Sequence, residues 1–110
     1  MASHLLERHF GTLKHLAKCS PKDCSHLIGS GSDDLIAALS EICHNLLVGN
    51  IPLSDKQLDK LRESADVLRE VGKKSTPIKK KRRVLVQEGG FLIPALIGMA
   101  LPLIKSILRI

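Results

Sequence analysis

The chain has 110 residues, enough for one small domain with extensions but too few for several domains. It has no Trp or Tyr and only two Phe, so exposed aromatic platforms for stacking single-stranded nucleic acid are not expected. The net charge of +6 is uneven: residues 1–72 carry −2 and residues 73–110 carry +8. This asymmetry indicates a near-neutral folded part joined to a cationic segment that attracts nucleic acid or an anionic membrane.

The apolar residues of the first 72 positions recur at the three- and four-residue spacing of amphipathic helices. One helix is expected over residues 3–19. A short second helix is expected after Ser20-Pro21, where the serine caps the helix and the proline occupies its first turn. This helix should end in the Gly29-Ser30-Gly31 break.

Two further helices have clear start and stop signals. Ser32 predicts the start of a third helix, and Gly49 supplies a left-handed stop. Ser54, with Gln57 three residues later, predicts a capping box that opens a fourth helix, which ends at Gly72. The predicted fold class is therefore all-α: a small bundle of about four helices, then a flexible basic hinge and a C-terminal apolar, Pro-kinked helix.

The chemistry of residues 1–72 indicates an interaction or assembly module and not an enzyme. The region has no Gly-rich phosphate loop and no cluster of carboxylates, and Cys43 and His44 point about 100° apart as neighbours on a helix. Cys19, Cys24 and Cys43 are an odd number of cysteines at spacings that match no disulfide framework or standard zinc module. We interpret them as reduced thiols, and we expect no metal or other cofactor.

Residues 73–90 are predicted to be a flexible basic hinge. Lys73-Lys74-Ser75-Thr76-Pro77 interrupts the fourth helix, and the adjacent cations that follow repel one another and have no acidic neighbours. The predicted polyanion-binding residues, called the basic run below, are Lys79, Lys80, Lys81, Arg82 and Arg83. The pattern fits non-specific contacts with the phosphates of double-stranded DNA, contacts with anionic lipid, a nuclear localisation signal, or a merely solubilising linker.

Residues 91–110, called the tail below, form an apolar helix by composition. Phe91–Ile104 is uncharged, but its 14 residues fall short of the ~20 that span a bilayer comfortably. Pro102 should kink the helix, and kinked cationic helices rich in Leu and Ile suit shallow insertion into one leaflet. The predicted membrane-inserting residues are Phe91, Leu92, Ile93, Leu96, Ile97, Met99, Leu101, Leu103, Ile104, Ile107 and Leu108. In the alternative, the tail folds back onto the helical module as core or forms an oligomer contact.

The stretch VLVQEGGFLIPAL, residues 84–96, carries a resemblance to a known group of proteins. A basic run, a Gly-Gly and a Leu/Ile-rich end are similar to the C-terminal part of the adenoviral minor core protein precursor, protein X or mu. The stretch resembles still more closely the short proteins encoded by Polinton/Maverick elements and their adintovirus relatives. The specific match covers about thirty residues, and the likeness of residues 1–72 is architectural.

The resemblance implies a small virion-type protein, either a core component on packaged double-stranded DNA or a membrane-active entry factor. It assigns polyanion binding to the basic run and a membrane or capsid-interior role to the tail. The chain departs from the adenoviral protein in having a single strong basic run where that protein is far richer in Arg and His. DNA compaction by one copy is therefore not implied.

The resemblance also points to a protease site. Proteases of the adenoviral type cut after a hydrophobic residue or Gln, any residue, and Gly-Gly, and Gln87-Glu88-Gly89-Gly90 fits this form. Cleavage there would free the tail as a membrane-active peptide. The structural alternative for Gly89-Gly90 is a flexible turn between hinge and tail.

Taken together, these features predict a non-enzymatic virion-type protein of an adenovirus-like or Polinton-like element. Its hinge would bind DNA or anionic lipid and its tail would act on membranes. One alternative is a DNA-associated minor core or packaging protein whose tail packs on its own helical module or on capsid protein. A second is a host-domesticated interaction module. The expected location is the virion or the host nucleus, with membrane association once the tail is released; an oligomer is compatible with all three.

Overall fold

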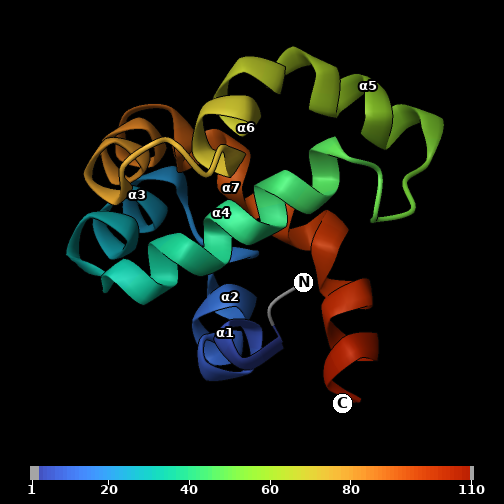
Figure 1. The fold of residues 1–110 in the computed structure, drawn as a ribbon, viewed down its shortest axis with the longest axis horizontal. Helices are drawn as coiled ribbons and strands as arrows, with labels where there is room; N and C mark the ends of the chain where they lie inside the picture. Colours follow the sequence, from blue (N-terminus) through green and yellow to red (C-terminus); the bar gives the residue numbers. More distant parts are fainter. Residues whose placement is uncertain (1–2, 110) are drawn as a thin grey trace.

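The computed structural model describes the backbone of residues 3–109 and the side chains of residues 4–88 and 92–109. Its regular structure is helical, and the described backbone contains no strand, so the all-α prediction is confirmed. Figure 1 shows the arrangement of the helices. In chain order they are α1 (Ser3–Arg8), α2 (Phe10–Leu16), α3 (Pro21–Ser30), α4 (Asp33–Leu47), α5 (Asp55–Glu63), α6 (Ala65–Gly72) and α7 (Ile78–Leu108).

The helix starts predicted from serine caps are confirmed. The side chains of Ser20, Ser32 and Ser54 each accept a hydrogen bond from the backbone N–H three residues later. At Ser54 the capping box is complete, because the Gln57 side chain accepts a hydrogen bond from the Ser54 backbone N–H at 2.9 Å. These bonds satisfy donors that the helix itself leaves without partners.

Two predicted helices are each divided in the structure. The helix expected over residues 3–19 breaks at His9 into α1 and α2, and the one after Ser54 breaks at Ser64 into α5 and α6. Both residues have non-helical backbone angles, φ −105° and ψ 11° at His9 and φ −114° and ψ 16° at Ser64. Apolar periodicity alone does not reveal such breaks, because it continues on both sides of them.

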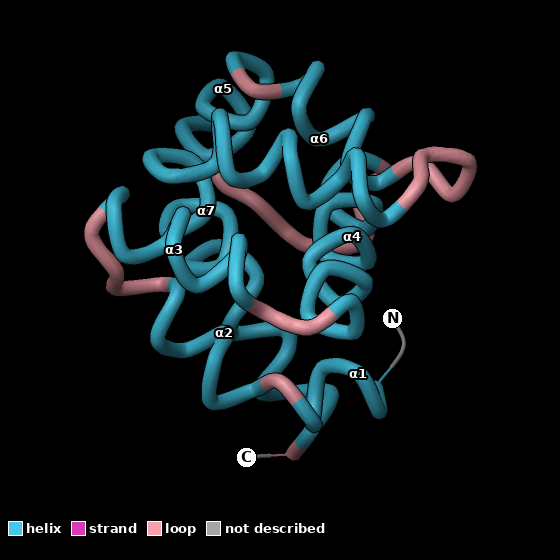
Figure 2. Tube along the Cα trace, turned by 90° about the vertical axis from the view of Figure 1, so that its left-hand side faces the viewer, coloured by secondary structure: helices cyan, strands magenta, loops and turns pink. Residues whose placement is uncertain are grey.

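The core is built around α4, which α6, α7 and α1 contact, while α7 also packs along α3 and α2. Figure 2 shows α3 and α7 side by side. The radius of gyration is 12.5 Å, close to the roughly 13 Å expected for a compact domain of this length. The first 72 residues and α7 thus share one core, to which α7 contributes Leu85 and residues of its second part.

The prediction of a flexible hinge over residues 73–90 is wrong from Ile78 onward. The basic run lies in the first turns of α7, directly after the loop that ends at Pro77. Helix formation follows from the stripe Ile78, Lys81 and Leu85, whose spacing of three and four residues puts them on one helix face. Leu85 is fully buried and Ile78 packs against the core, so this stripe docks the first part of α7.

The helix α7 changes direction sharply in the middle. Its two parts, Ile78–Glu88 and Leu92–Leu108, are inclined by 110° to one another. The large bend therefore lies where the sequence has Gly89-Gly90, before the Pro102 at which a kink was predicted. Pro94 adds to it, because proline has no N–H for the carbonyl four residues earlier and its ring presses on that turn.

The tail is part of the core. The residues of α7 beyond the bend that are at most 2% exposed are Ile93, Leu96, Ile97, Ala100 and Ile104. Among the other predicted membrane-inserting residues, Leu92, Met99, Leu101, Leu103 and Leu108 are partly buried against the core, and Ile107 is 37% exposed. The side chain of Phe91 lies outside the described residues. In the folded protein the tail thus packs on the helical module, the arrangement of the first alternative.

Within residues 3–109, none of the helices is by itself long and apolar enough to cross a membrane. The two parts of α7 meet the requirements of length and composition only as a pair joined across their bend.

The packing of the tail can be tested by truncating two isoleucines of α7. Ile97→Ala should lower the free energy of unfolding by roughly 2–5 kcal/mol, because it removes buried methyl groups and leaves a cavity. Ile107→Ala, at an exposed site, should change it by less than about 1 kcal/mol. Urea unfolding of both variants measures the difference. Equal, small effects would mean that the tail is not packed in solution.

Candidate polyanion-binding surface

The basic run occupies the first two turns of α7, and its five cations lie in different environments. Lys81 is buried, Arg82 is tied to α3 and α4, and Lys80 is paired with Glu70. Lys79 and Arg83 are exposed, and neither forms an ion pair or a side-chain hydrogen bond with the described residues. The predicted set of five binding residues is therefore divided by the fold.

Lys81 is only 5% exposed. Its Nζ donates a hydrogen bond to the Ser40 Oγ at 2.7 Å, and that hydroxyl donates to the Val71 carbonyl, also at 2.7 Å. The chain of bonds links α7 through α4 to α6. Because its ammonium is turned inward, Lys81 is not available to a polyanion in the folded protein, which corrects its predicted role.

The buried Lys81 has no carboxylate partner among the described residues. Burial lowers its pKa, and a smaller opposing effect comes from Cys43. Cys43 gives no real counter-charge, because burial raises the pKa of its thiol to about 12 and keeps it protonated at neutral pH. A charged Lys81 therefore costs the fold stability.

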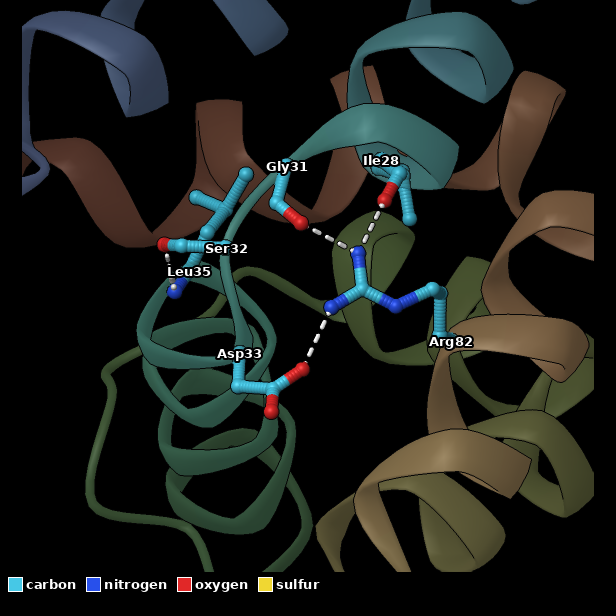
Figure 3. Close-up of polar contacts among 6 residues, drawn as sticks. All are labelled: Ile28, Gly31, Ser32, Asp33, Leu35 and Arg82. Atoms are coloured by element: carbon cyan, nitrogen blue, oxygen red, sulfur yellow. Dashed lines mark hydrogen bonds and ion pairs between the residues drawn. The ribbon is translucent and has the colours of Figure 1, made fainter.

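Arg82 joins the end of α3 to the start of α4 (Figure 3). One guanidinium nitrogen donates to the Ile28 carbonyl at 2.9 Å and to the Gly31 carbonyl, and the other donates to Asp33 at 2.7 Å. The carbonyls at the end of a helix lack intrahelical donors, and the guanidinium fork supplies them. Arg82 is thus engaged by the protein itself, a second correction to the predicted binding set.

Glu70 is the acidic side chain that neutralises part of the basic run. It pairs with Lys80 at 2.8 Å. Its pKa is lowered first by the hydrogen bond from Lys80 and by attraction to that charge, with a further contribution from Lys73. Lys73 and Lys80 therefore both lie near this one carboxylate.

The exposed cations around the start of α7 define the candidate surface. We call Lys73, Lys74, Lys79, Lys80 and Arg83 the basic face. Lys79 and Arg83, four residues apart on the helix, point to the same side, and Lys73 and Lys74 lie in the preceding loop. The sequence prediction omitted these two lysines from the binding set, although their closeness to the basic run signalled them.

The N-terminal end of α7 adds to the positive potential of the basic face. The first turn contains no acidic residue, and Pro77 provides no side-chain cap. The N-terminus of a helix carries partial positive charge from its unpaired N–H groups, so acidic side chains are favourable there. In α7 the nearby side chains are cations, which raises the positive potential further. This arrangement is relieved when an anion binds nearby.

The predicted protease site lies where the two parts of α7 meet. Gln87 and Glu88 are exposed at the end of the first part. Gly89 and Gly90 complete the site, and their backbone is helical. A protease groove that binds extended substrate would require this turn to unwind first.

The cysteines have no partners in covalent bonds, and Cys24 and Cys43 are buried while Cys19 is partly exposed. The pKa of the Cys24 thiol is raised to about 12, chiefly by burial and then by the nearby Cys19 thiol. With Cys43 raised to a similar value, two of the three thiols stay protonated and are poor nucleophiles. No group of three His, Cys, Asp or Glu side chains among the described residues gathers to hold a metal ion.

Comparison with known proteins adds no family assignment: no protein-family model, curated protein or solved structure matches this chain.

The burial of Lys81 predicts that the free energy of unfolding depends on pH. Since the folded-state pKa lies below its ordinary value of 10.5, the unfolded chain binds more protons between the two values, and folding stability rises with pH across that window. Lys81→Met removes the buried cation and should stabilise the protein at pH 7 by roughly 1–4 kcal/mol.

Urea unfolding of wild type and Lys81→Met over a pH series measures this dependence. The free energy of unfolding of Lys81→Met should exceed that of wild type most at neutral pH, and the difference should shrink as pH approaches 10.5. Both proteins keep Cys24 and Cys43, so the difference between them isolates Lys81. A difference that stays constant across pH would show that Lys81 is not a buried cation.

Proposed function

We propose that this chain is a non-enzymatic polyanion-binding protein that docks on the phosphates of double-stranded DNA through the basic face. The observation that carries the proposal is the basic face itself: five exposed cations around the start of one helix, with Glu70 as the carboxylate paired to it among the described residues. Such a surface gains affinity by releasing the counterions of a phosphate backbone. In this proposal its contacts are with phosphates, which carry no sequence information, so binding would be independent of sequence.

DNA is favoured over lipid as the first polyanion because of where the apolar residues lie. In the folded state the tail residues that would enter a bilayer, such as Ile93, Ile97 and Ile104, are fully buried or nearly so. The protein therefore presents charge without an adjoining inserting surface. Stable membrane binding usually needs both signals together.

A second candidate function is membrane activity after release of the tail. Leu92–Leu108 is a separate helical part of α7, set apart by the 110° bend, with Lys105 as its single charged residue. A cut or an unwinding between the two parts would free it as one piece. Released together with Arg109, it would have the apolar composition and the two cations near one end that suit a helix inserting into one leaflet.

The biological setting in this proposal rests on the resemblance of residues 84–96 to the Polinton/Maverick and adenoviral proteins. It makes the chain a virion-type protein whose further partners are capsid protein and an adenovirus-type protease. The location proposed is the virion or the host nucleus, and the membrane after release. A host-domesticated interaction module would keep the basic face and the packed tail without these partners.

DNA binding is tested by titrating a labelled short duplex with the protein over a series of salt concentrations. The logarithm of the affinity should fall linearly with the logarithm of the salt concentration, with a slope near −0.9 for each phosphate contacted. The double variant Lys79→Ser/Arg83→Ser should reduce the slope by about 2. Shuffling the duplex sequence should leave the affinity unchanged.

Two controls separate binding from folding. Lys105→Ser removes an exposed cation at the other end of α7 and should leave the slope as in wild type. Arg82→Gln should lower stability by about 1–3 kcal/mol, because it leaves the Ile28 and Gly31 carbonyls without their donor, yet leave the slope unchanged. A slope near zero, or one that Lys79 and Arg83 do not affect, would refute DNA docking by the basic face.

Membrane activity is tested by dye release from anionic liposomes, comparing the full chain, residues 1–90 and the 91–110 peptide. Because the tail is core in the folded protein, the peptide should release dye at concentrations about tenfold or more below those the full chain needs. The fragment 1–90 lacks the helix that covers part of the core, so it is compared only after circular dichroism has established how much of its helix remains. An inactive peptide would eliminate the second candidate function and leave DNA docking unaffected.

A further inference from the structure

Exposed apolar side chains gather at one place on the molecule. Among the described residues, the large hydrophobic side chains that are most exposed are Leu47 at 36%, Val48 at 54%, Leu58 at 37% and Ile107 at 37%. Leu47 and Val48 end α4, and Leu58 lies on the neighbouring α5, whereas Ile107 lies near the end of α7. Three of the four therefore belong to one region.

Two hollows lie in this region and adjoin each other. One, of about 270 Å³, is lined by His44, Leu47, Val48, Arg69, Glu70, Gly72 and Lys73. The other, of about 240 Å³, is lined by Leu46, Leu47, Gly49, Leu58, Leu61, Arg62, Ala65 and Arg69. Leu47 and Arg69 line both hollows, so the two lie next to each other; the pair of hollows is called the α4–α6 groove below.

The groove is open because α5 covers it poorly. Helix α5 makes fewer contacts with the rest of the fold than any other helix, and it lies at the edge of the molecule next to α6 (Figure 1). Leu61 is its buried anchor at 8% exposed, whereas Leu58, about one turn earlier, is 37% exposed. In a helix that buried its apolar stripe fully, both would be inside.

The rim of the groove is cationic. Arg62, Arg69 and Lys73 line it, and the one acidic lining residue, Glu70, is already paired with Lys80. Arg62 and Arg69 contact Asp59 and Asp66 at 3.2 Å; these aspartates are not among the lining residues, and both pairs are solvent-exposed. Exposed pairs of this kind contribute at most about 1 kcal/mol, so both guanidinium groups can turn to a new carboxylate.

We propose that the α4–α6 groove binds an amphipathic helix of a partner protein, with apolar side chains against Leu47, Val48 and Leu58 and flanking Asp or Glu side chains on Arg62 and Arg69. Laying an apolar helix face into such a groove is a common mode of recognition, and the cationic rim selects acidic flanks. The proposal goes beyond DNA docking: apart from Lys73, its residues lie outside the basic face. It gives the helical module a protein partner of its own.

The test is a selection from a display library of helical peptides about four turns long. Apolar residues are fixed along one face, and the flanking positions vary among Asp, Glu, Lys, Arg, Gln and Ser. Selection on the folded full-length chain should enrich peptides with Asp or Glu flanks. One enriched peptide is then synthesised, together with a version whose acidic residues are replaced by Lys, and binding is measured by fluorescence anisotropy.

Val48→Glu and Arg69→Glu should each weaken the acidic peptide at least about tenfold, as expected for loss of a central contact and of charge complementarity. Ile107→Glu is the control: Ile107 is 37% exposed, as Leu58 is, but it lies far along the chain on α7, so the variant should bind like wild type. Thermal unfolding verifies that each variant is folded.

Three outcomes would overturn the proposal: no enrichment, enrichment of neutral or basic flanks, or binding that Val48→Glu leaves intact. Sedimentation supplies a fourth. If the wild type self-associates and Val48→Glu abolishes this, the occupant is a second copy of the chain. The double variant Lys79→Ser/Arg83→Ser should keep peptide binding while it loses DNA affinity, so failure of either proposal can be recognised independently.

Discussion

The apolar side of α7 has to be covered, and most of the structure follows from that constraint. Beyond the bend, Ile93, Ile97 and Ile104 pack into the core, and before it Leu85 docks the first part of α7 against α3 and α4. A straight helix cannot follow both directions, which differ by 110°. The bend thus lets one continuous helix cover two sides of the bundle.

Docking of the first part of α7 also determines the environment of each of its cations. Lys81 lies on the same stripe as Leu85 and is carried into the protein, where a single hydroxyl, that of Ser40, receives it. Arg82, one position further round the helix, donates to the Ile28 and Gly31 carbonyls at the end of α3. The charges that remain on the outer side are those of the basic face. One helix therefore contributes to the core, binds two neighbouring helices and carries exposed cations of the basic face.

The sequence predicts local structure here better than it predicts the environment of individual residues. The helix caps at Ser20, Ser32 and Ser54 depend on residues close together in the sequence, and their prediction is confirmed. The burial of Lys81 was missed because five adjacent cations look solvated, although the spacing of Ile78, Lys81 and Leu85 contained the signal. The contacts of Arg82 and the α4–α6 groove depend on residues distant in the chain, which periodicity does not bring together.

The position of α7 in the chain has a consequence for how the protein is made. During synthesis α3 and α4 emerge before the helix that covers them, with Ile28, Ile36 and Leu39 still lacking part of their cover. A nascent chain of this kind is left with apolar surface facing water until α7 has been translated. Its folding is completed only by contacts between residues far apart in sequence, and partly folded chains with exposed apolar surface of this kind are prone to aggregate.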